Sequence, residues 1–562
     1  MSDEKKNPNI DLVKSQLAEG QINRREFLRY ATLLGMSASA AYAFAGKITG
    51  EGLVAPAQAQ TALPKGGTLR IGSRIKEIKS PHTYSWGAWD SNISRQVCEY
   101  LTLTDEHNVT HPYLLEKWDT SPDLKTWTLH LRKNIKWHNG QPLTADDVIW
   151  NLKQCLDPEV GSSVIGLMKG YLLEEYDTGQ KDEKGQPKKS TRLWDANAIQ
   201  KIDDHTVRLN CKVPQVAVPE HLFHYPLAIL YPGDKGVFGP GAQGTGAFEL
   251  TDFQLGKRAS LKAHKGYWGQ GPHLDGIEFI DMGDDPSAAI SAMASKQVHG
   301  LVIADPVQYD ALKAMKFLKL YQVATAETAV LRVKVTEKPF DNPKVRKAMR
   351  LAVDQKHVVE AALRGLGVVG EHHHVSPVQP DYAKLPMFKR NVAEAKKLLA
   401  EAGFPNGIES TIYVPKDPPW NGAEVEAAVE QWKEAGIRLK INVMPGQEYW
   451  DVWTKVPVGC TIWYHRPLGV MVLGLAYRSG VPWNESGYSN PEFDKLLTEA
   501  EGTLDVAKRR EIMAQLEKIM QEDGPIVQPI WRNNFTFYDQ KVEGFTMHPT
   551  QYIFGNRLAL KA

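Results

Sequence analysis

The sequence predicts an α/β protein with at least two lobes, and two observations lead to this fold class. The chain has 562 residues, and a single hydrophobic core stops growing near about 250–300 residues. Beyond residue 325, helices with apolar residues at three-to-four spacing alternate with short strands, which is typical of an α/β domain. The chain is therefore expected to bury its apolar surface in more than one unit.

The first 59 residues have the layout of a signal peptide. A basic leader precedes an apolar run, residues 30–46, that is diluted by Ser, Thr and Gly. A membrane-spanning helix needs roughly 20 predominantly apolar residues, so this run is too short. Small residues at 57–59 then form an A-x-A site for cleavage before Gln60.

The arginine pair in the leader resembles the twin-arginine signal, which directs the export of folded proteins. Arg24 and Arg25 are followed by Phe27 and Leu28, while Asn23 stands where Ser or Thr is usual. We therefore expect the mature chain to reach the periplasm, and the leader to lie outside the fold. The alternative is an amphipathic N-terminal helix that belongs to the mature fold.

The charge, hydropathy and cysteine spacing of the chain argue against several classes of function. The 67 Lys and Arg balance 66 Asp and Glu without a basic tract, so nucleic acid is not an expected partner. After the leader, no stretch is apolar and long enough to cross a bilayer. The cysteines lack the spacing of a zinc site, and the sequence leaves open whether export oxidises any of Cys98, Cys155, Cys211 and Cys460.

The mature chain begins with strands and short helices. Residues 66–75 alternate apolar and polar side chains after a glycine pair, which predicts an opening strand. The loop at 79–92 follows. Further strands and strand–helix units are expected at 125–156, 244–268 and 283–303.

Longer helices are expected beyond residue 325. Their apolar residues recur at helical spacing, and two of them end at an Ala-Gly stop; they cover 342–363, 391–403, 424–436 and 506–524. Strands are expected between and after them at 409–415, 438–445 and 525–539.

No motif for catalysis or nucleotide binding is present. The chain lacks a GxSxG elbow, a Cys-His pair, a Walker loop and a GxGxxG turn. Asp341, Arg346 and Asp354 lie close in sequence, and we interpret them as helix caps and a polar helix face. We therefore expect a protein that is not an enzyme and has no cofactor, with a secreted enzyme of unrecognised site as an alternative.

Six motifs in one order resemble the family 5 extracellular solute-binding proteins of ABC importers, the dipeptide- and oligopeptide-binding type. The resemblance covers essentially the whole mature chain. The motifs are HPYLLEKW to DVIWNLK (111–153), GTGAFEL (244–250), GYWGQGPHLDGIEFI (266–280), KPFDNPKVRKAMRLAVDQ (338–355), AKKLLAEAGFPNG (395–407) and NPEFDKLL (490–497).

The resemblance implies a two-lobe periplasmic-binding-protein fold, hinged by two crossing strands and closing on a ligand. Lobe I would hold 60–104, 236–323 and 530–562, with 105–235 as an inserted subdomain, and lobe II would hold 324–529. Such a receptor captures a peptide-like or other small organic solute and delivers it to ABC permease and ATPase subunits in the inner membrane. It would act as a monomer.

Residues 460–493 correspond to a cleft-lining segment of that family, in which peptide binders commonly carry an aspartate for the α-ammonium of the ligand. This chain has no acidic residue from 460 to 481 and instead carries Tyr464, His465 and Arg466. A guanidinium suits a carboxylate or phosphate, so we expect a solute with an anionic group or without a free ammonium. The alternative is that Arg466 pairs with a nearby surface acid.

Aromatic residues on two loops are further candidates for solute contact. Tyr84, Trp86 and Trp89 lie on the loop at 79–92, while Trp483 and Asn484 lie on a loop of the second lobe. Solute pockets are mostly apolar with a few placed polar groups. These residues are expected to form facing aromatic walls across the cleft.

The segment GEHHHVSP at 370–377 leaves a metal or metal-chelate receptor of the same fold as an alternative function. Alternate residues of an extended chain share a face, so His372 and His374 could both reach one ion. The other interpretation of these histidines is a solvated loop near the mouth of the cleft.

Overall fold

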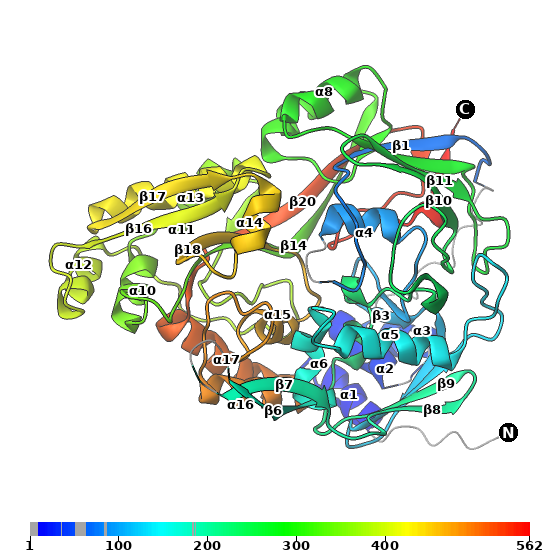
Figure 1. The fold of residues 1–562 in the computed structure, drawn as a ribbon, viewed down its shortest axis with the longest axis horizontal. Coiled ribbons are helices and arrows are strands. Elements are labelled where there is room, and N and C mark those ends of the chain that lie inside the picture. Colours follow the sequence, from blue (N-terminus) through cyan, green and yellow to red (C-terminus); the bar gives the residue numbers. More distant parts are fainter. Residues whose placement is uncertain are drawn as a thin grey trace.

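The structure is a computed structural model, which describes residues 9–34, 36, 38–50, 63–83, 87–181, 185 and 187–561. A twelve-stranded mixed sheet runs through both halves of the molecule (Figure 1). In spatial order its main strands are β10 (Phe248–Gln254), β11 (Arg258–Ala263), β12 (Gly276–Asp281), β1 (Thr68–Ser73), β13 (Gly300–Leu301), β20 (Ile530–Asp539), β14 (Leu318–Val333), β18 (Val458–Trp463), β16 (Ile408–Pro415) and β17 (Ile437–Met444). The short strands β15 (Gly367–Val369) and β19 (Ile526–Val527) pair with β20 and β14.

Two long strands connect the halves of this sheet. β14 pairs antiparallel with β20 up to Glu327, and from Thr328 onward it pairs antiparallel with β18 and, at Leu331 and Arg332, with β19. The register of β14 against β20 shifts between Ala324 and Glu327, just before the pairing with β18 begins. β14 and β20 are thus the crossing strands of a two-lobe fold, as the sequence predicted, and they lie centrally in Figure 1.

The first lobe is built on β1, which pairs parallel with both β12 and β13. β1 confirms the opening strand expected at 66–75, and the antiparallel β10–β11 pair confirms the strands expected at 244–268. The helical elements of this lobe are α4 (Ala88–Ser94), α8 (Pro286–Ala294), η3 (Pro306–Gln308), α9 (Tyr309–Lys313) and η4 (Gly555–Arg557). A small pair, β21 (Val542–Glu543) and β22 (Ala559–Leu560), closes the C-terminal part.

The second lobe places β16 parallel to β17 and β18. Its helices are α10 (Pro343–Leu351), α11 (Gln355–Leu363), α12 (Val392–Glu401), α13 (Pro419–Glu434), α14 (Gly446–Val452), α15 (Gly469–Ala476), α16 (Pro491–Gly502) and α17 (Val506–Asp523). The helix expected over 342–363 is divided into α10 and α11. The division follows from Asp354, whose carboxylate caps α11 by accepting backbone N–H bonds from Lys356 and His357.

Between α4 and β10 the chain forms a smaller unit. Its four-stranded sheet has the order β4 (Leu115–Thr120), β5 (Thr126–Leu131), β9 (Thr206–Asn210) and β8 (Ile199–Asp203). The other strands form the pairs β2 (Thr102–Thr104) with β3 (Thr110–Pro112), and β6 (Leu173–Lys181) with β7 (Pro187–Leu193). The helical elements are α5 (Ala145–Leu156), α6 (Val164–Leu172), α7 (Val218–His221), η1 (Tyr225–Leu227) and η2 (Pro232–Asp234).

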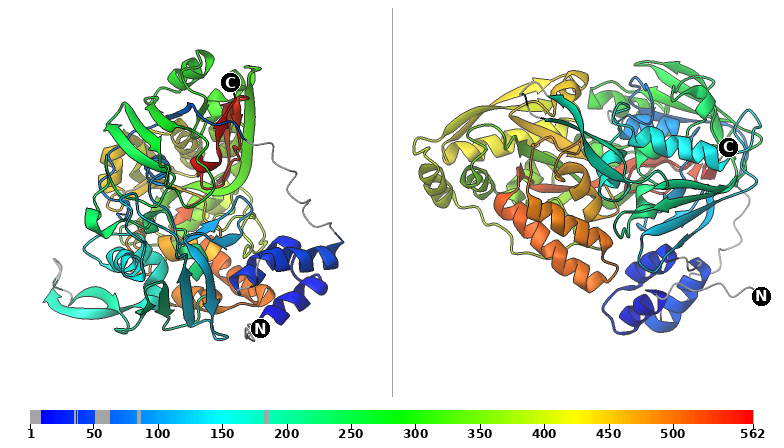
Figure 2. Two further views of the ribbon diagram at one scale, coloured as in Figure 1. Left: turned by 90° about the vertical axis from the view of Figure 1, so that its right-hand side faces the viewer. Right: turned by 60° about the horizontal axis from the view of Figure 1, so that its bottom comes forward.

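The N-terminal segment forms three helices that pack on the body of the protein (Figure 2). These are α1 (Asn9–Ala18), α2 (Arg24–Leu33) and α3 (Ala38–Thr49). Phe27 and Tyr30 of α2 are fully buried, and Arg29 Nε donates to Glu220 Oε1 at 3.1 Å. In the full chain this segment thus packs on the body instead of lying outside the fold, while its removal on export stays a prediction.

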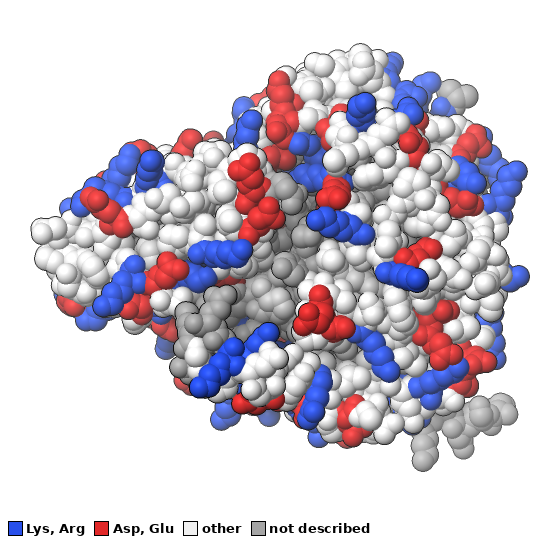
Figure 3. Space-filling view, in the orientation of Figure 1, with Lys and Arg blue, Asp and Glu red and all other residues white. Residues whose placement is uncertain are grey.

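Further sequence-based expectations concern membrane spans, cysteines and surface charge. Within the described residues, no helix is both long and apolar enough to cross a membrane. All four thiols are buried and none is in a disulfide. Acidic and basic side chains are interspersed over the face shown in Figure 3, as the balanced composition leads one to expect.

Candidate functional site

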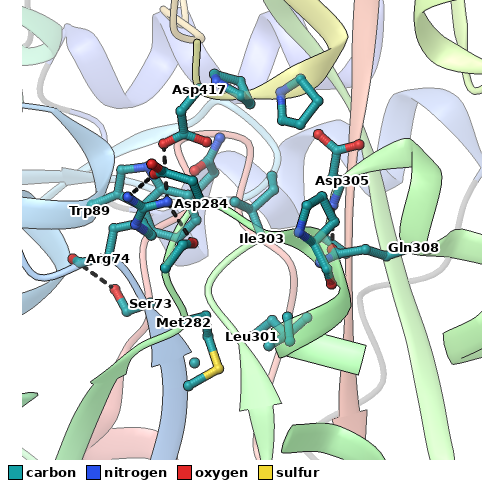
Figure 4. Close-up of a pocket in the computed structure, with 18 of the residues that line it drawn as sticks. Ser73, Arg74, Trp89, Met282, Asp284, Leu301, Ile303, Asp305, Gln308 and Asp417 are labelled. Atoms are coloured by element: carbon teal, nitrogen blue, oxygen red, sulfur yellow. Dashed lines mark hydrogen bonds and ion pairs between the residues drawn. The ribbon is translucent and has the colours of Figure 1, made fainter. Parts of the chain in front are cut away.

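A first hollow lies where the two halves of the central sheet meet. The chain lines it with residues that directly follow β1, β12, β13, β16 and β18, such as Arg74, Asp284, Ile303, Asp417 and Tyr464. Open α/β sheets bind ligands outside the carboxyl ends of their strands. The space in this hollow is about 750 Å³ when its solvent-open part is included, and Figure 4 shows the side chains that line it.

Most charged groups of the first hollow pair with each other. Arg74 Nη1 lies 3.4 Å from Asp417 Oδ2, so this ion pair joins the two lobes. Arg74 also contacts Asp284, and Figure 4 shows its guanidinium between the two carboxylates. Burial raises the pKa of Asp417, and the charge of Arg74 opposes that rise. The Arg74–Asp417 ion pair therefore connects the lobes at this hollow.

The crossing strands add a second compensated pair to the first hollow. Arg532 Nη1 donates to Glu327 Oε1 at 2.9 Å, and the other carboxylate oxygen accepts from Asn534 and Gln551 at 2.8 Å each. Asp305, on the first-lobe side, has one carboxylate oxygen without a hydrogen-bond partner in the described chain. Burial raises the pKa of Asp305. The first hollow is thus acidic, and both of its guanidinium groups are in ion pairs with carboxylates of the protein.

A second hollow, with about 440 Å³ of space when its solvent-open part is included, shares Tyr464 with the first. Its walls come from three parts of the chain. Arg95, just after α4, belongs to the first lobe, Tyr225 to the smaller unit, and Arg466 to the loop after β18 in the second lobe.

Arg466 is buried, with 4% of its surface exposed. Its Nη1 donates to the carbonyl oxygens of Tyr464 at 2.9 Å and His465 at 3.1 Å, and its Nη2 donates to the Tyr225 hydroxyl at 3.3 Å. The Nε has no partner, and no described carboxylate forms an ion pair with this guanidinium. The alternative that Arg466 pairs with a nearby acid is therefore not found in the described part of the chain.

Arg95 is buried to the same extent on the opposite wall. Its Nε donates to the Tyr100 hydroxyl at 3.1 Å, and its guanidinium carbon lies 4.5 Å from the ring centroid of Tyr552, a cation–π contact. The Nη1 has no partner. Glu220 also lines this hollow, but it is the carboxylate that Arg29 binds. Among the described residues, Arg95 thus has no carboxylate in an ion pair.

Four of the predicted contact residues line these hollows. Trp89 lines the first, Tyr464 lines both, and His465 and Arg466 line the second. His465 also has a structural role, because its Nδ1 accepts the N–H of Ala326 in crossing strand β14 at 2.9 Å. Burial lowers the pKa of His465 to about 3, so its ring is neutral at physiological pH. Contact of these four with a solute stays a prediction.

The remaining predicted contacts have other positions. Tyr84 and Trp86 lie outside the described residues. Trp483 is buried, with its ring against Trp463 at a centroid distance of 5.6 Å, and Asn484 Nδ2 donates to loop carbonyl oxygens. Neither Trp483 nor Asn484 is among the residues that line the two hollows. Their packing favours a structural role, and the predicted solute contact stays untested.

The three consecutive histidines are buried, so the expectation of a solvated loop is wrong. His372 Nδ1 accepts the N–H of Gln528 at 3.0 Å, and His374 Nδ1 lies 2.6 Å from the Tyr477 hydroxyl. Burial lowers the pKa of His372 and of His374 to about 3. Within the described residues, no group of three or more His, Cys, Asp or Glu is placed to hold a metal ion.

Some charged residues of the hollows were not predicted from sequence. Arg74, Asp305 and Asp417 each lie one to four residues after a strand that ends at the cleft. That position is the signal that could have identified them, because the ends of parallel strands meet at one edge of a sheet. Arg95 carries no such signal, since it follows a short helix.

Comparison with known proteins places the chain in one family. Residues 109–469 match the family described as bacterial extracellular solute-binding proteins, family 5. The chain is 27% identical over 469 residues to the periplasmic oligopeptide-binding protein OppA of Haemophilus influenzae, covering 78% of this chain and 84% of that protein.

Two solved structures share its fold. The binding protein AgaA of A. tumefaciens in complex with agropinic acid matches with a TM-score of 0.78 at 20% identity, covering 88% of this chain and 99% of AgaA. DppA of Helicobacter pylori in complex with a peptide matches with a TM-score of 0.76 at 19% identity, covering 89% of this chain and 99% of DppA. With its two lobes, crossing strands and family match, this chain belongs to the bacterial extracellular solute-binding proteins, family 5.

Proposed function

We propose that the protein is the receptor of an ABC importer, which captures a small organic solute between its lobes and delivers it to the permease. The observation that carries this proposal is the pair of hollows between two lobes that β14 and β20 connect along the central sheet. Hinged lobes of this kind close around ligands. The OppA relative named above is a periplasmic peptide-binding protein.

The proposed solute contacts are Trp89 in the first hollow, Arg466 in the second, and Tyr464 between them. An apolar wall with a few fixed polar groups suits a small organic solute. The uncompensated guanidinium of Arg466 favours a solute that carries a carboxylate or phosphate. A peptide-like molecule with an anionic group fits these walls.

Thermal unfolding with a panel of small organic solutes tests the receptor function against an enzymatic one. A receptor gains stability as RT ln(1 + [L]/Kd) and leaves the solute intact. We expect at least one solute to raise the unfolding temperature and to be recovered unchanged by mass spectrometry. Chemical conversion of that solute by the purified protein would contradict the proposal and favour the alternative of a secreted enzyme.

Small-angle scattering tests the hinge. A solute that stabilises the protein should also decrease its radius of gyration, because the lobes approach each other on binding. The same data give the molecular mass, for which we expect a monomer. Unchanged scattering with a solute that demonstrably binds would contradict closure of the lobes.

Export through the twin-arginine route is tested by replacing Arg24 and Arg25 with Lys. We expect this variant to remain in the cytoplasm with its leader uncleaved, whereas Arg438→Lys, at an exposed ion pair on β17, should be exported normally. Unchanged export of the Arg24 and Arg25 variant would exclude the twin-arginine route.

A further inference from the structure

The second hollow brings together two buried guanidinium groups from opposite lobes. Arg95 follows α4, which packs in the first-lobe core, and Arg466 follows β18 of the second lobe. Hydrogen bonds of Tyr225 link the two arginines. Its hydroxyl accepts from Arg466, and its carbonyl oxygen accepts from the Tyr100 hydroxyl that Arg95 binds.

Neither guanidinium of this pair is in an ion pair with a described carboxylate. Glu220, a carboxylate that lines the same hollow, accepts from Arg29 of α2 through Oε1, and its Oε2 has no partner among the described residues. Burial lowers the pKa of the neighbouring His224, so that its ring is neutral. Burial also lowers the pKa of Arg466, and the charge of Arg95 acts in the same direction. Two like charges in a partly dry space repel each other more strongly than in water.

Arg95 and Arg466 each keep one nitrogen without a hydrogen-bond partner, Nη1 of Arg95 and Nε of Arg466. A buried donor without an acceptor is unfavourable by roughly the strength of a lost hydrogen bond. An anionic oxygen in this hollow would accept from both groups and would also offset their repulsion. Carboxylate and phosphate match the planar donor fork of arginine.

We propose that Arg95 and Arg466 form an anion latch, in which the carboxylate or phosphate of the solute bridges the two guanidinium groups and thereby holds the lobes together. This inference rests on the proposed receptor function and deepens it. Without an anion, the repulsion between the two groups opposes closure. The anionic group of the solute is therefore the part that drives closure, whatever the rest of the solute is.

Matched pairs of solutes test the class of ligand. A defined pool would contain small amino-acid, peptide and sugar-phosphate solutes, each with a free carboxylate or phosphate, together with its methyl ester, amide or dephosphorylated form. The solutes that the full chain retains through gel filtration are identified by mass spectrometry. We expect the anionic members to be retained at least tenfold more than their neutral derivatives. Comparison of the carboxylate solutes with the phosphate solutes then shows which of the two anionic groups the hollow binds.

Substitution of the two arginines tests whether they bind the anion or only maintain the structure. Arg95→Gln and Arg466→Gln each remove one charge, Arg95→Lys and Arg466→Lys keep it, and Arg438→Gln is a surface control. We expect each Gln variant to bind the retained solute at least tenfold more weakly, and to have a smaller radius of gyration without solute than the parent. Lost packing alone would weaken binding without compacting the solute-free protein. The Lys variants should keep the larger solute-free radius and bind with intermediate affinity.

Each of these experiments has a result that would overturn the proposal. Equal retention of anionic solutes and neutral derivatives would overturn the latch while leaving the receptor function in place. Full affinity in either Gln variant, or a solute-free radius that does not decrease, would also overturn it. Retention of no solute at all would contradict the receptor function itself, and with it the latch.

Discussion

The arginines of the two hollows differ in their partners. In the first hollow, Arg74 and Arg532 each bind a carboxylate of the protein, and the Arg74–Asp417 pair joins the lobes. In the second, Arg95 and Arg466 have backbone, hydroxyl and aromatic partners but no carboxylate among the described residues. Both hollows are partly buried, so this difference does not follow from solvent exposure.

This difference indicates which part of the cleft serves stability and which serves recognition. A buried ion that has lost its partner is strongly unfavourable, so the ion pairs of the first hollow are expected to maintain the fold and the approach of the lobes. Cations that lack a protein partner are instead available to a ligand. Substitutions in the first hollow should therefore change mainly stability, and those in the second mainly affinity.

The largest expected effect is in the first hollow. Glu327→Ala would leave Arg532 buried without its carboxylate, and breaking such a pair destabilises by about 3–5 kcal/mol. Arg466→Gln removes a charge that has no carboxylate partner, so its loss of unfolding free energy should be smaller, about 1–2 kcal/mol for the hydrogen bonds that it breaks. Denaturant unfolding of both variants measures the contrast. Equal losses would show that the two hollows do not differ in this way.

Asp90, in the first turn of α4, tests whether a carboxylate balances the charge of Arg95. Burial raises the pKa of Asp90 to about 6 from its ordinary value of 3.8. The folded state then binds the proton more tightly than the unfolded state, so this group makes stability fall as pH rises from about 4 to 6, by up to about 3 kcal/mol.

Asp90→Asn should remove that slope and be more stable than the parent at pH 7. Unfolding free energies of both proteins between pH 4 and 7 give the difference. If Asp90 instead balanced Arg95, its pKa would be depressed. The parent would then lose stability relative to the variant as pH falls below about 4.

Affinity is expected to depend on Arg466. Arg466→Ala should weaken binding of an anionic solute about ten- to a hundredfold, since a charge-assisted hydrogen bond in a closed cleft contributes about 1.5–3 kcal/mol. Arg466→Lys should recover only part of this, because an ammonium cannot reproduce the planar fork. Calorimetry measures both variants, and parent-like affinity of Arg466→Ala would remove this residue from the site.

The smallest effect is expected at the ion pair between the lobes. Arg74 and Asp417 keep 17% and 21% of their side-chain surface exposed, so solvent screens the pair. Asp417→Asn should therefore change the unfolding free energy by less than about 1 kcal/mol. A loss above about 2 kcal/mol in the same denaturant experiment would mean that this pair is as important as the buried Glu327–Arg532 pair.

The fold was largely accessible from sequence, because apolar periodicity and turn residues are local signals. They predicted β1, the β10–β11 pair and the α/β character of the second lobe, and the order of six motifs predicted the family. Arg466 was identified because it replaces an acidic residue in a known segment. Its position opposite Arg95 was not accessible, since two residues far apart in the chain meet only through the tertiary fold.

For the histidine segment, the exposure predicted from the sequence was wrong. Glycine and proline beside polar residues are typical of surface loops, yet His372, His373 and His374 are buried. Their burial depends on partners such as Gln528 and Tyr477, which lie on other elements. Local composition gives no information on such partners, so the exposure of this polar segment was predicted wrongly.

The most direct test of the central claim is a crystal structure of the protein with a solute retained from the pool. The account predicts an anionic group in the second hollow within hydrogen-bonding distance, roughly 2.7–3.2 Å, of both Arg95 and Arg466. The Arg74–Asp417 pair should remain intact in the same structure. A solute that places a cationic or apolar group between Arg95 and Arg466 would contradict the account.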